Sequence, residues 1–474
     1  MAATTPPPGQ HRSLTPLMVL GCTSDAGKSL LVTALCRWFA RQGVDVAPFK
    51  AQNMSNNARV VAGGEIGVAQ WLQAKAARLE PDVRMNPVLV KPEADTQSQV
   101  VVRGVVDRDL TNTAWTDRHD ALWVPMSESF DDLASEHELV VIEGAGSPAE
   151  INLRDQVNNR MIDHADAAGL LVSDIDRGGS FAHLFGTWSL VPDVTRERLD
   201  GFVLNRFRGD PTLLAPGPQR LTEMTGMAAA GVMPMLRHEL PREEGGAEQS
   251  TAPADAPLVV IPRFPFGSNL DEFHLLGTAA RVRWVDRPSG LDDLDPTRDL
   301  VILPGSKHVA SDLDWLRERG LADAVAAAVR RGVRVVGVCG GAMMLGTTIE
   351  DPDGVEGGRP WSRHGLGLLD ANTRLGGNKQ VVATEVDVFG GRFSGYEIRF
   401  GELDDARQVI ERGDVVATTV HGLFEHGDVM EHLLGVRPTR GLDDTFELLA
   451  DAVEAHLDTS LLRSLVGLSD QISS

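Results

Sequence analysis

Nine short runs of apolar, largely β-branched residues recur along this chain and alternate with segments of helical periodicity. The runs lie at 17–21, 44–49, 139–143, 170–174, 201–205, 258–261, 282–285, 300–303 and 333–338. Runs that are apolar throughout, rather than at alternate positions, are typical of strands buried on both faces of a parallel sheet. Between the first two runs, residues 28–42 carry their apolar side chains on one helical face. The pattern therefore predicts an α/β chain with two doubly wound sheets.

A change in composition divides the chain between the two sets of runs. Residues 241–257 are rich in Pro, Gly, Ala and Glu and have no apolar periodicity, so we expect a linker there. The sequence thus predicts one domain over 16–240 and a second over 258–470. Residues 1–15 are polar and proline-rich and lack an apolar core, which predicts a disordered leader rather than a secretory signal.

The charge balance excludes some classes of partner. Lys plus Arg total 45 and Asp plus Glu total 67, a formal net charge of −22. Such an acidic chain is a poor candidate for binding nucleic acid or an anionic membrane surface. No apolar run approaches the roughly 18 residues of a membrane span, so no membrane insertion is expected.

Cysteine usage favours a reducing compartment. The chain has three cysteines, Cys22, Cys36 and Cys339, too few for a disulfide framework, so a cytoplasmic location is expected. No Cys/His cluster has the spacing of a zinc site.

The first apolar run leads into a glycine-bearing loop with the sequence GCTSDAGKS, residues 21–29, and a helical pattern follows. Backbone N–H groups of such a loop, together with the helix N-terminus, can surround phosphate oxygens. Its lysine is expected to reach the terminal phosphates of a nucleotide and its last serine to bind Mg²⁺. The loop is one residue longer than the usual G-x4-GK[ST]. The predicted nucleotide ligands here are Thr23, Ser24, Asp25, Ala26, Gly27, Lys28 and Ser29.

Three further residues at the ends of apolar runs are candidates for the same site. Glu143 ends the run LVVIE and is expected to hold the magnesium ion together with Ser29, although an acidic residue can also simply end a strand. Lys50 is a second candidate phosphate ligand. Asn205 is a candidate to read an adenine edge through its amide.

A nucleophile is predicted in the second half, where residues 334–346 read RVVGVCGGAMMLG. Glycines on both sides of Cys339 allow the sharp strand-to-helix turn that exposes a nucleophile, and a helix N-terminus favours the thiolate. The N–H groups of Gly340 and Gly305 are expected to form the oxyanion hole, and His421 is expected to be the base. The alternative for Cys339 is a buried, inert thiol.

Together the two sites suggest one reaction sequence. Glutamine hydrolysis at the cysteine releases ammonia, and ATP converts a carboxylate into an acyl phosphate at the other site. Ammonia then displaces phosphate and forms an amide.

These motifs resemble those of the adenosylcobyric acid synthase family, the glutamine-hydrolysing amidotransferases of cobalamin biosynthesis. The similarity covers about 16–465. The matching segments are GCTSDAGKS, APFKAQNMSNNA, GGEIGVAQWLQAKAA, MNPVLVKP, VVIEGAGSPAEINLRDQ, DIDRGGSFAHLFGT, GFVLNRFRGD, LPGSK, GVCGG, GYEIRFG and VHGLFEHG. The resemblance implies an N-terminal P-loop domain like dethiobiotin synthetase and a C-terminal class I glutamine amidotransferase domain with a flavodoxin-like fold.

The resemblance also implies a function, a carbon–nitrogen ligase with glutamine as the amide donor. Its substrates would be adenosylcobyrinic acid a,c-diamide, amidated at the b, d, e and g carboxylates, with ATP, glutamine and Mg²⁺, and no tightly bound prosthetic group is expected. By resemblance, Cys339 is the nucleophile, His421 its base, and Lys28, Ser29 and Glu143 serve the Mg-nucleotide. The residues expected to line the corrinoid and acyl-phosphate region are Gln52, Asn53, Asp174, Asp176 and Arg177. The sequence leaves the oligomeric state open.

The chain departs from the family pattern around the glutamine pocket. Leu423 stands where glutaminases of this class often have Glu, so His421 is expected to act in a Cys–His dyad. Met343 replaces a glutamine that usually helps hold the substrate, and Ala342 replaces an aromatic residue. We therefore expect a retained glutaminase with a loosened pocket.

Three other functions remain open at this point. One is a related amidoligase, such as cobyrinic acid a,c-diamide synthase or a cell-wall precursor amidotransferase, although the QNM and GGEIG segments favour the cobyric type. Another is a regulatory ATPase of the partition type, which leaves Cys339 and His421 unexplained. The third is a glutaminase half that serves only as a scaffold.

Overall fold

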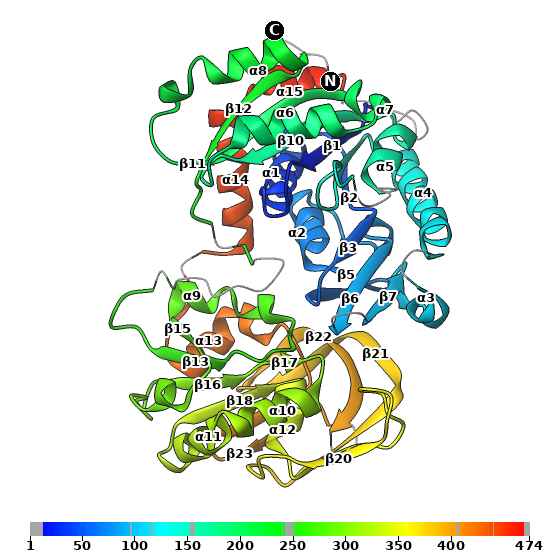
Figure 1. The fold of residues 1–474 in the computed structure, drawn as a ribbon. Coiled ribbons are helices and arrows are strands. Elements are labelled where there is room, and N and C mark those ends of the chain that lie inside the picture. Colours follow the sequence, from blue (N-terminus) through cyan, green and yellow to red (C-terminus); the bar gives the residue numbers. More distant parts are fainter. Residues whose placement is uncertain are drawn as a thin grey trace, which may run out of the picture.

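The chain folds into two lobes that meet at a waist (Figure 1). The computed structural model describes residues 13–94, 97–114, 117–151, 157–238, 240–241, 250, 252–403, 407–438 and 440–468. Among the helices in these ranges, none is both long and apolar enough to cross a membrane.

The first domain is built on a sheet of six parallel strands in the order β12-β11-β10-β1-β9-β2. The strands are β1 (Leu17–Gly21), β2 (Val46–Phe49), β9 (Leu139–Glu143), β10 (Ala168–Asp174), β11 (Leu199–Phe207) and β12 (Ala228–Pro234). From β1 the chain runs to the edge at β2, returns through β9, and continues on the other side of β1. The sheet is therefore doubly wound, which confirms the predicted fold class.

Helices cover both faces of this sheet, which explains why its strands are apolar at every position. The helices of this domain are α1 (Lys28–Arg41), α2 (Val68–Ala76), α3 (Arg108–Asn112), α4 (His119–Glu136), α5 (Asn158–His164), α6 (Ser180–Leu190), α7 (Asp193–Arg196) and α8 (Gly217–Thr225), with 3₁₀ turns η1 (Val83–Met85) and η3 (Pro211–Leu214). Of these, α3 contacts a smaller sheet described below. In β1, Leu17 and Val19 pack toward α1, whereas Met18 and Leu20 pack toward α4, α5 and α6. Successive strand residues point to opposite faces, so both sets must be apolar.

The last two helices of the chain return to the first domain. In Figure 1, α14 (Leu442–His456) lies beside α1, and α15 (Thr459–Leu465) lies by the same sheet. Phe446, Leu449 and Val453 of α14 share one core with α1. The sequence predicts a second domain up to residue 470, and the structure corrects this: the apolar face of α14 completes the first domain.

The predicted leader and linker are partly outside the described residues, which omit 1–12, 242–249 and 251. The last leader residues belong to the fold, because the N–H of Leu14 donates to Glu138 O (2.8 Å) and that of Thr15 to Val466 O (3.0 Å). At the end of the linker, the Ser250 hydroxyl donates to the Ala280 carbonyl (2.7 Å).

Two small sheets project from the first domain toward the waist. One has the order β3-β6-β7-β8 and the other pairs β4 with β5. Their strands are β3 (Gln52–Met54), β4 (Ala58–Val61), β5 (Gly64–Gly67), β6 (Val88–Ala94), β7 (Gln97–Val102) and β8 (Val105–Val106). The hairpin β4–β5 contacts strands of the second domain, so it forms part of the interface between the lobes.

The second domain has its own six-stranded sheet in the order β15-β13-β16-β18-β24-β23, parallel except for the last pair. Its strands are β13 (Leu258–Pro262), β15 (Arg281–Val285), β16 (Leu300–Leu303), β18 (Arg334–Val338), β23 (Val409–Arg412) and β24 (Val415–Thr418). One face packs on α10 (Val309–Glu318), α11 (Leu321–Arg330), α12 (Gly340–Leu345) and η5 (Pro288–Leu291), and the other on η4 (Leu270–Phe273), α9 (Leu276–Ala279), η6 (Leu423–Glu425) and α13 (Gly427–Leu434).

A long hairpin extends this domain toward the waist. It is formed by β21 (Asn372–Val388) and β22 (Gly391–Leu403), flanked by β19 (Thr348–Asp351) and β20 (Trp361–His364), while β14 (Gly267–Ser268) pairs with β17 (Gly305–Ser306). The sequence did not predict the hairpin, because β21 carries many polar residues and much of it is exposed.

Candidate functional site

The predicted phosphate loop lies between β1 and α1, at the carboxyl end of the central strand. Gly27 adopts φ +90°, and a Cβ there would lie 2.1 Å from Asn205 Nδ2, so both conformation and space require glycine. Lys28 folds back over the loop, with Nζ 3.3 Å from the Thr23 carbonyl. The loop residues at positions 24 and 25 are exposed. The helix N-terminus and the lysine thus converge on one side of the loop, as phosphate binding requires.

Glu143 is the centre of a buried polar cluster next to this loop. Its Oε1 accepts hydrogen bonds from Ser29 Oγ (2.8 Å) and Lys50 Nζ (2.8 Å), and its Oε2 accepts one from Gln73 Nε2 (2.5 Å). Burial alone would raise the pKa of Glu143, but the Lys50 charge and these hydrogen bonds hold it below its usual value. Glu143 is therefore ionised and 2% exposed.

The Ser29 and Glu143 oxygens fit a magnesium ion. They lie 2.8 Å apart. Adjacent ligands of an octahedral ion with bonds of about 2.1 Å are about 3 Å apart. Hydroxyl and carboxylate oxygens are also the donors that Mg²⁺ prefers. Lys50 supplies positive charge to Glu143 in this arrangement.

Asn205, the predicted ligand of an adenine edge, contacts the phosphate loop. Its Nδ2 donates to the Ala26 carbonyl (2.8 Å) and its Oδ1 accepts from the Arg206 N–H (2.9 Å). Both amide atoms are therefore engaged by the backbone, and the side chain is 4% exposed. Asn205 thus supports the phosphate loop through the Ala26 carbonyl, and its contact with an adenine edge stays a prediction.

The predicted substrate residues after β10 form an ion-pair cluster beside the loop. Asp174 is buried and lies 3.1 Å from Arg206 Nη1 and 3.4 Å from Arg177 Nε. Its Oδ1 accepts the Asp176 N–H (2.9 Å). Arg177 is mostly exposed and reaches Asp25 of the phosphate loop (3.7 Å). The structure therefore brings these residues to the edge of the nucleotide site.

The other two predicted substrate residues lie in β3. Asn53 is buried and its Nδ2 donates to Gln70 Oε1 (3.1 Å), while Gln70 Nε2 lies 3.5 Å from Glu143 Oε2. Gln52 is half-buried at the start of the same strand. Asn53 is thus linked through one side chain to the carboxylate of the nucleotide site.

Cys339 stands at a sharp turn between β18 and α12. Its backbone has φ +50° and ψ −108°, a conformation that a non-glycine residue rarely adopts. Gly341 has no room for a side chain, since a Cβ there would lie 2.0 Å from the Leu303 carbonyl. The Cys339 N–H donates to Thr418 O (2.7 Å) and fixes the turn to the neighbouring strand. This is the geometry of a nucleophile elbow.

His421 lies against Cys339 and has an acidic partner that the sequence did not reveal. Its Nδ1 is 2.7 Å from Glu272 Oε1, and the other oxygen of that carboxylate accepts the Gly422 N–H (2.9 Å). Burial lowers the pKa of His421, but the charges of Glu272 and Cys339 and its hydrogen bonds to both raise it to about 10. The residues therefore form a Cys–His–Glu triad, which corrects the predicted dyad.

The two glycines predicted for the oxyanion hole flank this triad. Gly340 directly follows the nucleophile, and a Cβ on it would lie 2.7 Å from the Ser306 nitrogen. Gly305 is in β17, and a Cβ there would lie 3.1 Å from His421 Cε1. The predicted loops thus meet at the cysteine.

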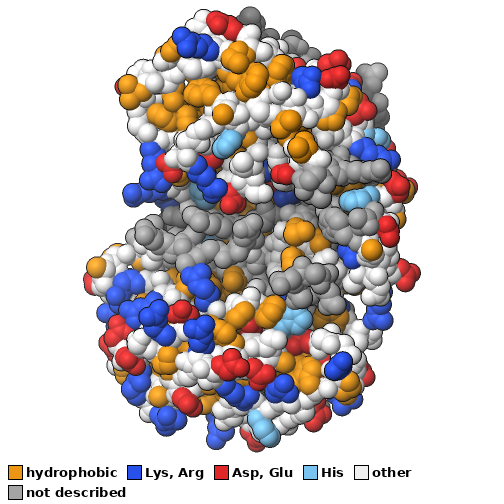
Figure 2. Space-filling view, viewed as in Figure 1, with side chains coloured by type: hydrophobic (Ala, Val, Ile, Leu, Met, Phe, Trp, Pro, Cys, Tyr) orange, Lys and Arg blue, Asp and Glu red, His pale blue; other side chains and the backbone are white. Residues whose placement is uncertain are grey.

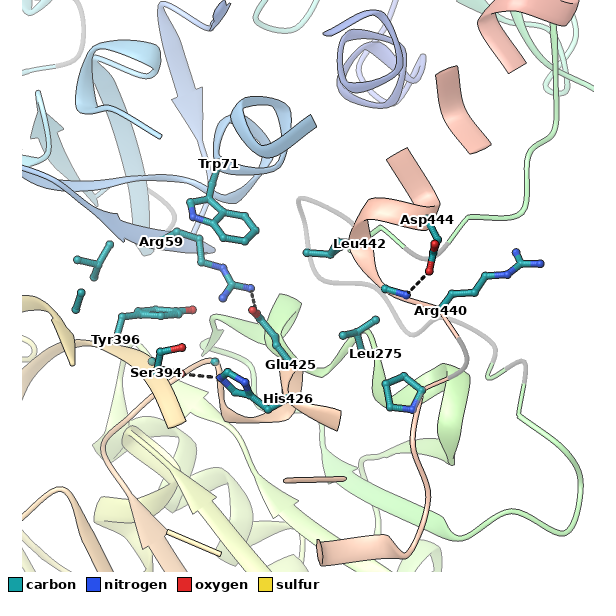
Figure 3. A pocket seen from close by; sticks show the side chains of 16 residues that line it. Arg59, Trp71, Leu275, Ser394, Tyr396, Glu425, His426, Arg440, Leu442 and Asp444 are labelled. Carbon is teal, nitrogen blue, oxygen red and sulfur yellow. Dashed lines mark hydrogen bonds and ion pairs between the residues drawn. The ribbon is translucent and has the colours of Figure 1, made fainter. Parts of the chain in front are cut away.

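Arg59, which the sequence analysis did not single out, connects the two domains. Its guanidinium comes from β4, is 3% exposed, and pairs with Asp271 and Glu425 of the second domain. It lies 5.2 Å from the Trp71 ring centroid and 5.1 Å from that of Tyr396, and Figure 3 shows it between the two rings. Arg59 and both rings are among the residues that line a cavity of about 520 Å³ at the waist.

The stack continues into the triad. The Tyr396 ring is stacked on His421 with centroids 5.4 Å apart, and Asp271 directly precedes Glu272 in η4. The first domain therefore packs directly on the residues that hold His421.

Basic side chains are unevenly distributed on this acidic chain. Figure 2 shows Lys and Arg gathered on one side of the waist, both above and below it, whereas the formal net charge is −22. Local positive charge at the waist can attract anions that the whole-molecule field would repel.

Comparisons with known proteins agree with the two-domain architecture. The family model of the CobQ/CobB/MinD/ParA nucleotide binding domain matches residues 17–244. That of the CobB/CobQ-like glutamine amidotransferase domain matches residues 258–429. The second match ends before α14, where the chain returns to the first domain.

Curated relatives match along nearly the whole chain. The cobyric acid synthase of Variovorax paradoxus is 48% identical over 483 residues, which cover 95% of this chain and 99% of the relative. Those of Polaromonas sp. strain JS666 (46%) and Deinococcus radiodurans (48%) each cover 95% of this chain and 98% of the relative. A solved glutamine amidotransferase structure covers 41% of this chain and 98% of its own at 22% identity and a TM-score of 0.27.

Proposed function

The chain belongs to the cobyric acid synthase family of glutamine-dependent carbon–nitrogen ligases, and we propose that it amidates the b, d, e and g carboxylates of adenosylcobyrinic acid a,c-diamide. ATP and glutamine are the co-substrates, and adenosylcobyric acid is the product. The observation that supports this most is the pairing of two constellations in one chain: Ser29 and Glu143 beside a phosphate loop, and Cys339, His421 and Glu272 at a nucleophile elbow.

Ammonia release begins with Cys339. Its thiolate attacks the side-chain amide carbon of glutamine, and the N–H groups of Gly340 and Gly305 stabilise the oxyanion. His421, kept protonated by Glu272, gives its proton to the leaving ammonia. The product of this step is a thioester on the cysteine.

Hydrolysis of the thioester restores the cysteine. His421 now accepts a proton from the attacking water, and glutamate leaves. Glu272 fixes the tautomer and orientation of the ring through Nδ1, so that Nε2 is left to face the sulfur and the water.

Activation of the carboxylate takes place at the phosphate loop. Lys28 and the loop N–H groups hold the nucleotide phosphates, and Ser29 and Glu143 would hold a magnesium ion, which supplies positive charge to them. A substrate carboxylate attacks the γ-phosphorus and ADP leaves, which gives an acyl phosphate. Ammonia then attacks the acyl carbon, phosphate leaves, and one amide is formed for each ATP and glutamine consumed.

Product analysis tests the proposal. The protein is incubated with the diamide corrinoid, ATP, Mg²⁺ and glutamine, and the corrinoid is followed by mass spectrometry. We expect four successive replacements of OH by NH₂. An unchanged corrinoid, or amidation only when the a and c carboxylates are free, would contradict the proposal and favour a related amidoligase.

Cys339→Ala separates the two halves of the reaction. Removal of the nucleophile is expected to lower glutamine-dependent amidation by roughly 10³-fold or more, while ammonia-dependent amidation remains. A regulatory ATPase would show unchanged ATP turnover, and a scaffold-only glutaminase would show no glutamine use even before the substitution.

A further inference from the structure

Lysine is rare in this chain and its placement is informative. Only six of the 45 Lys and Arg residues are lysines. Lys28 and Lys50 lie in the nucleotide site, and Lys75 lies on α2, where it pairs with Glu80 (3.0 Å). The remaining three line one cavity, which also contains the nucleophile: Lys91, Lys307 and Lys379. A compact ammonium group suits a narrow space better than a guanidinium, so this concentration points to a binding role.

The walls of this cavity come from both domains. Cys339 and Met343 belong to the second domain, whereas Asn56 and Lys91 belong to the first and lie between β3 and β4 and in β6. Met343 offers only a thioether, a weak hydrogen-bond acceptor. A ligand at Cys339 therefore needs polar partners other than Met343, and the first domain offers Asn56 and Lys91 at the same cavity.

Two ammonium groups share one carboxylate at this cavity. Lys91 Nζ lies 2.5 Å from Glu65 Oε2, and Lys379 Nζ contacts the other oxygen of the same carboxylate. All three side chains are at least nine-tenths buried. Burial and the nearby Lys379 and Lys307 charges lower the pKa of Lys91 to about 7, although Glu65 favours its charged form. The negative charge of Glu65 therefore does not fully balance the buried positive charge. An added anion would relieve that cost.

Hydrogen-bond acceptors line the same cavity. Asn56 Oδ1 is buried and has no hydrogen-bond partner among the residues that the structure describes. Glu356 is buried enough that its pKa rises to about 7, and its carboxylate accepts the Ala310 N–H (3.3 Å). An acceptor left without a partner is costly unless a ligand satisfies it.

We propose that this cavity recognises the zwitterionic end of an α-amino acid through both domains. Lys91 and Lys379 bind the α-carboxylate. Asn56 Oδ1 and Glu356 accept hydrogen bonds from the α-ammonium group, and the side-chain amide then points to the nucleophile. The glutaminase site is complete only when the first domain is in place. This inference rests on the proposed function, because it takes glutamine as the ligand.

The test compares glutamine with 4-aminobutanamide, which lacks only the α-carboxylate. Glutamate or 4-aminobutanoate release is measured for the wild type, for Lys91→Met and Lys379→Met, and for Lys75→Met as a control lysine outside the cavity. We expect each cavity variant to lose about 10- to 100-fold in kcat/KM for glutamine, mainly through KM, and to change little with the analogue. The control should match the wild type with both substrates.

Ammonia-dependent amidation of the corrinoid reports whether each variant is folded. If one cavity variant fails to fold, the other still decides the question. The inference is overturned if a folded cavity variant keeps the wild-type ratio of kcat/KM for glutamine to kcat/KM for 4-aminobutanamide. The proposed function would still stand in that case. A wild type that hydrolyses no glutamine would instead refute the proposed function.

Discussion

Glu272 is a buried carboxylate that holds the predicted catalytic histidine, His421. It is 0% exposed and reaches His421 from a segment 149 residues away in the chain. Its two oxygens hold the ring nitrogen and the following backbone N–H, so it fixes both the charge and the orientation of the imidazole. The same local arrangement explains why Leu423 can stand where related glutaminases have an acid.

Replacing Glu272 by Gln tests this role through the pH profile. The raised pKa keeps His421 protonated through neutral pH, so wild-type glutaminase activity should fall only as the pH rises toward about 10. Without the carboxylate charge, the pKa of His421 falls, and the alkaline limb should move to lower pH. Activity at neutral pH should fall by roughly 10²- to 10⁴-fold.

The conservative variant Glu272→Asp serves as the matched control and should restore part of the alkaline shift. Ammonia-dependent amidation should be unaffected in both variants. An alkaline limb that stays in place in Glu272→Gln would show that Glu272 is merely structural.

Glu143 is the buried carboxylate at the centre of the predicted nucleotide site. Glu143→Gln should abolish amidation with either nitrogen source but leave glutamine hydrolysis, because only the phosphate site is changed. It also breaks the buried ion pair between Glu143 and Lys50 (2.8 Å), which should destabilise the first domain by about 3–5 kcal/mol.

The pH dependence of that loss follows from the lowered pKa of Glu143. A carboxyl with a depressed folded pKa stabilises the fold above its unfolded value, about 4.3, and this stabilisation is lost as the pH falls through the folded value. Urea unfolding of wild type and variant should therefore differ most near pH 7 and converge in acid. A constant difference at all pH values would contradict this assignment.

At the scale of elements, α14 is the unexpected component. It follows the glutaminase domain in sequence, yet its apolar face fills the core next to α1. Ion pairs add to the contact: the buried Arg37 pairs with Glu447 (3.2 Å), and Arg41 pairs with Asp451 at the rim (2.6 Å). The first domain therefore needs the end of the chain to bury one side of its sheet.

Phe446→Ala should reveal this dependence. The ring is 2% exposed and lies 5.3 Å from the Arg37 guanidinium carbon. Its removal should cost about 3–5 kcal/mol of unfolding free energy. Asp451→Ala on the same helix removes only a rim ion pair and should cost much less. Phe446→Ala should therefore weaken ATP binding and lower the melting temperature of the first domain. If Asp451→Ala lowers both by as much, the first domain does not depend on the buried ring.

At the scale of the whole molecule, Arg59 links the two active sites. On one side, the Arg59 guanidinium lies against the ring of Trp71, a residue of α2. Gln70 and Gln73 of the same helix contact Glu143. On its other side, Tyr396 stacks on His421. Contacting side chains therefore connect the predicted nucleotide site to the triad, and we predict that a change at one end affects the other.

Arg59→Met should uncouple the two reactions. It keeps much of the packing but leaves Asp271 and Glu425 buried without their cation, so glutamine-dependent amidation should fall by roughly 10- to 100-fold. Ammonia-dependent amidation should change far less. The measurement is the ratio of the two rates, with Arg59→Lys as the charge-preserving control. A ratio unchanged from the wild type would show that Arg59 only holds the domains together.

The features that depend on local backbone geometry could be predicted from the sequence. The apolar runs predicted the buried parallel strands, and the family and the two α/β domains are confirmed. The phosphate loop and the turn at Cys339 could be located because glycine and strand-to-helix patterns constrain only neighbouring residues. The catalytic roles of those residues stay predictions for the experiments above.

The side chains that join these segments from far away in the sequence became visible only in the folded chain. Glu272 behind His421, Arg59 at the waist and Lys91 in the cavity of Cys339 have no neighbouring motif that marks them, because each meets residues of a remote segment. The same holds for α14, whose apolar face fits either domain by periodicity alone. The contact between the two domains contains buried charges and aromatic rings. A buried charge without a partner is costly, so these side chains must meet partners of opposite charge when the domains pack together.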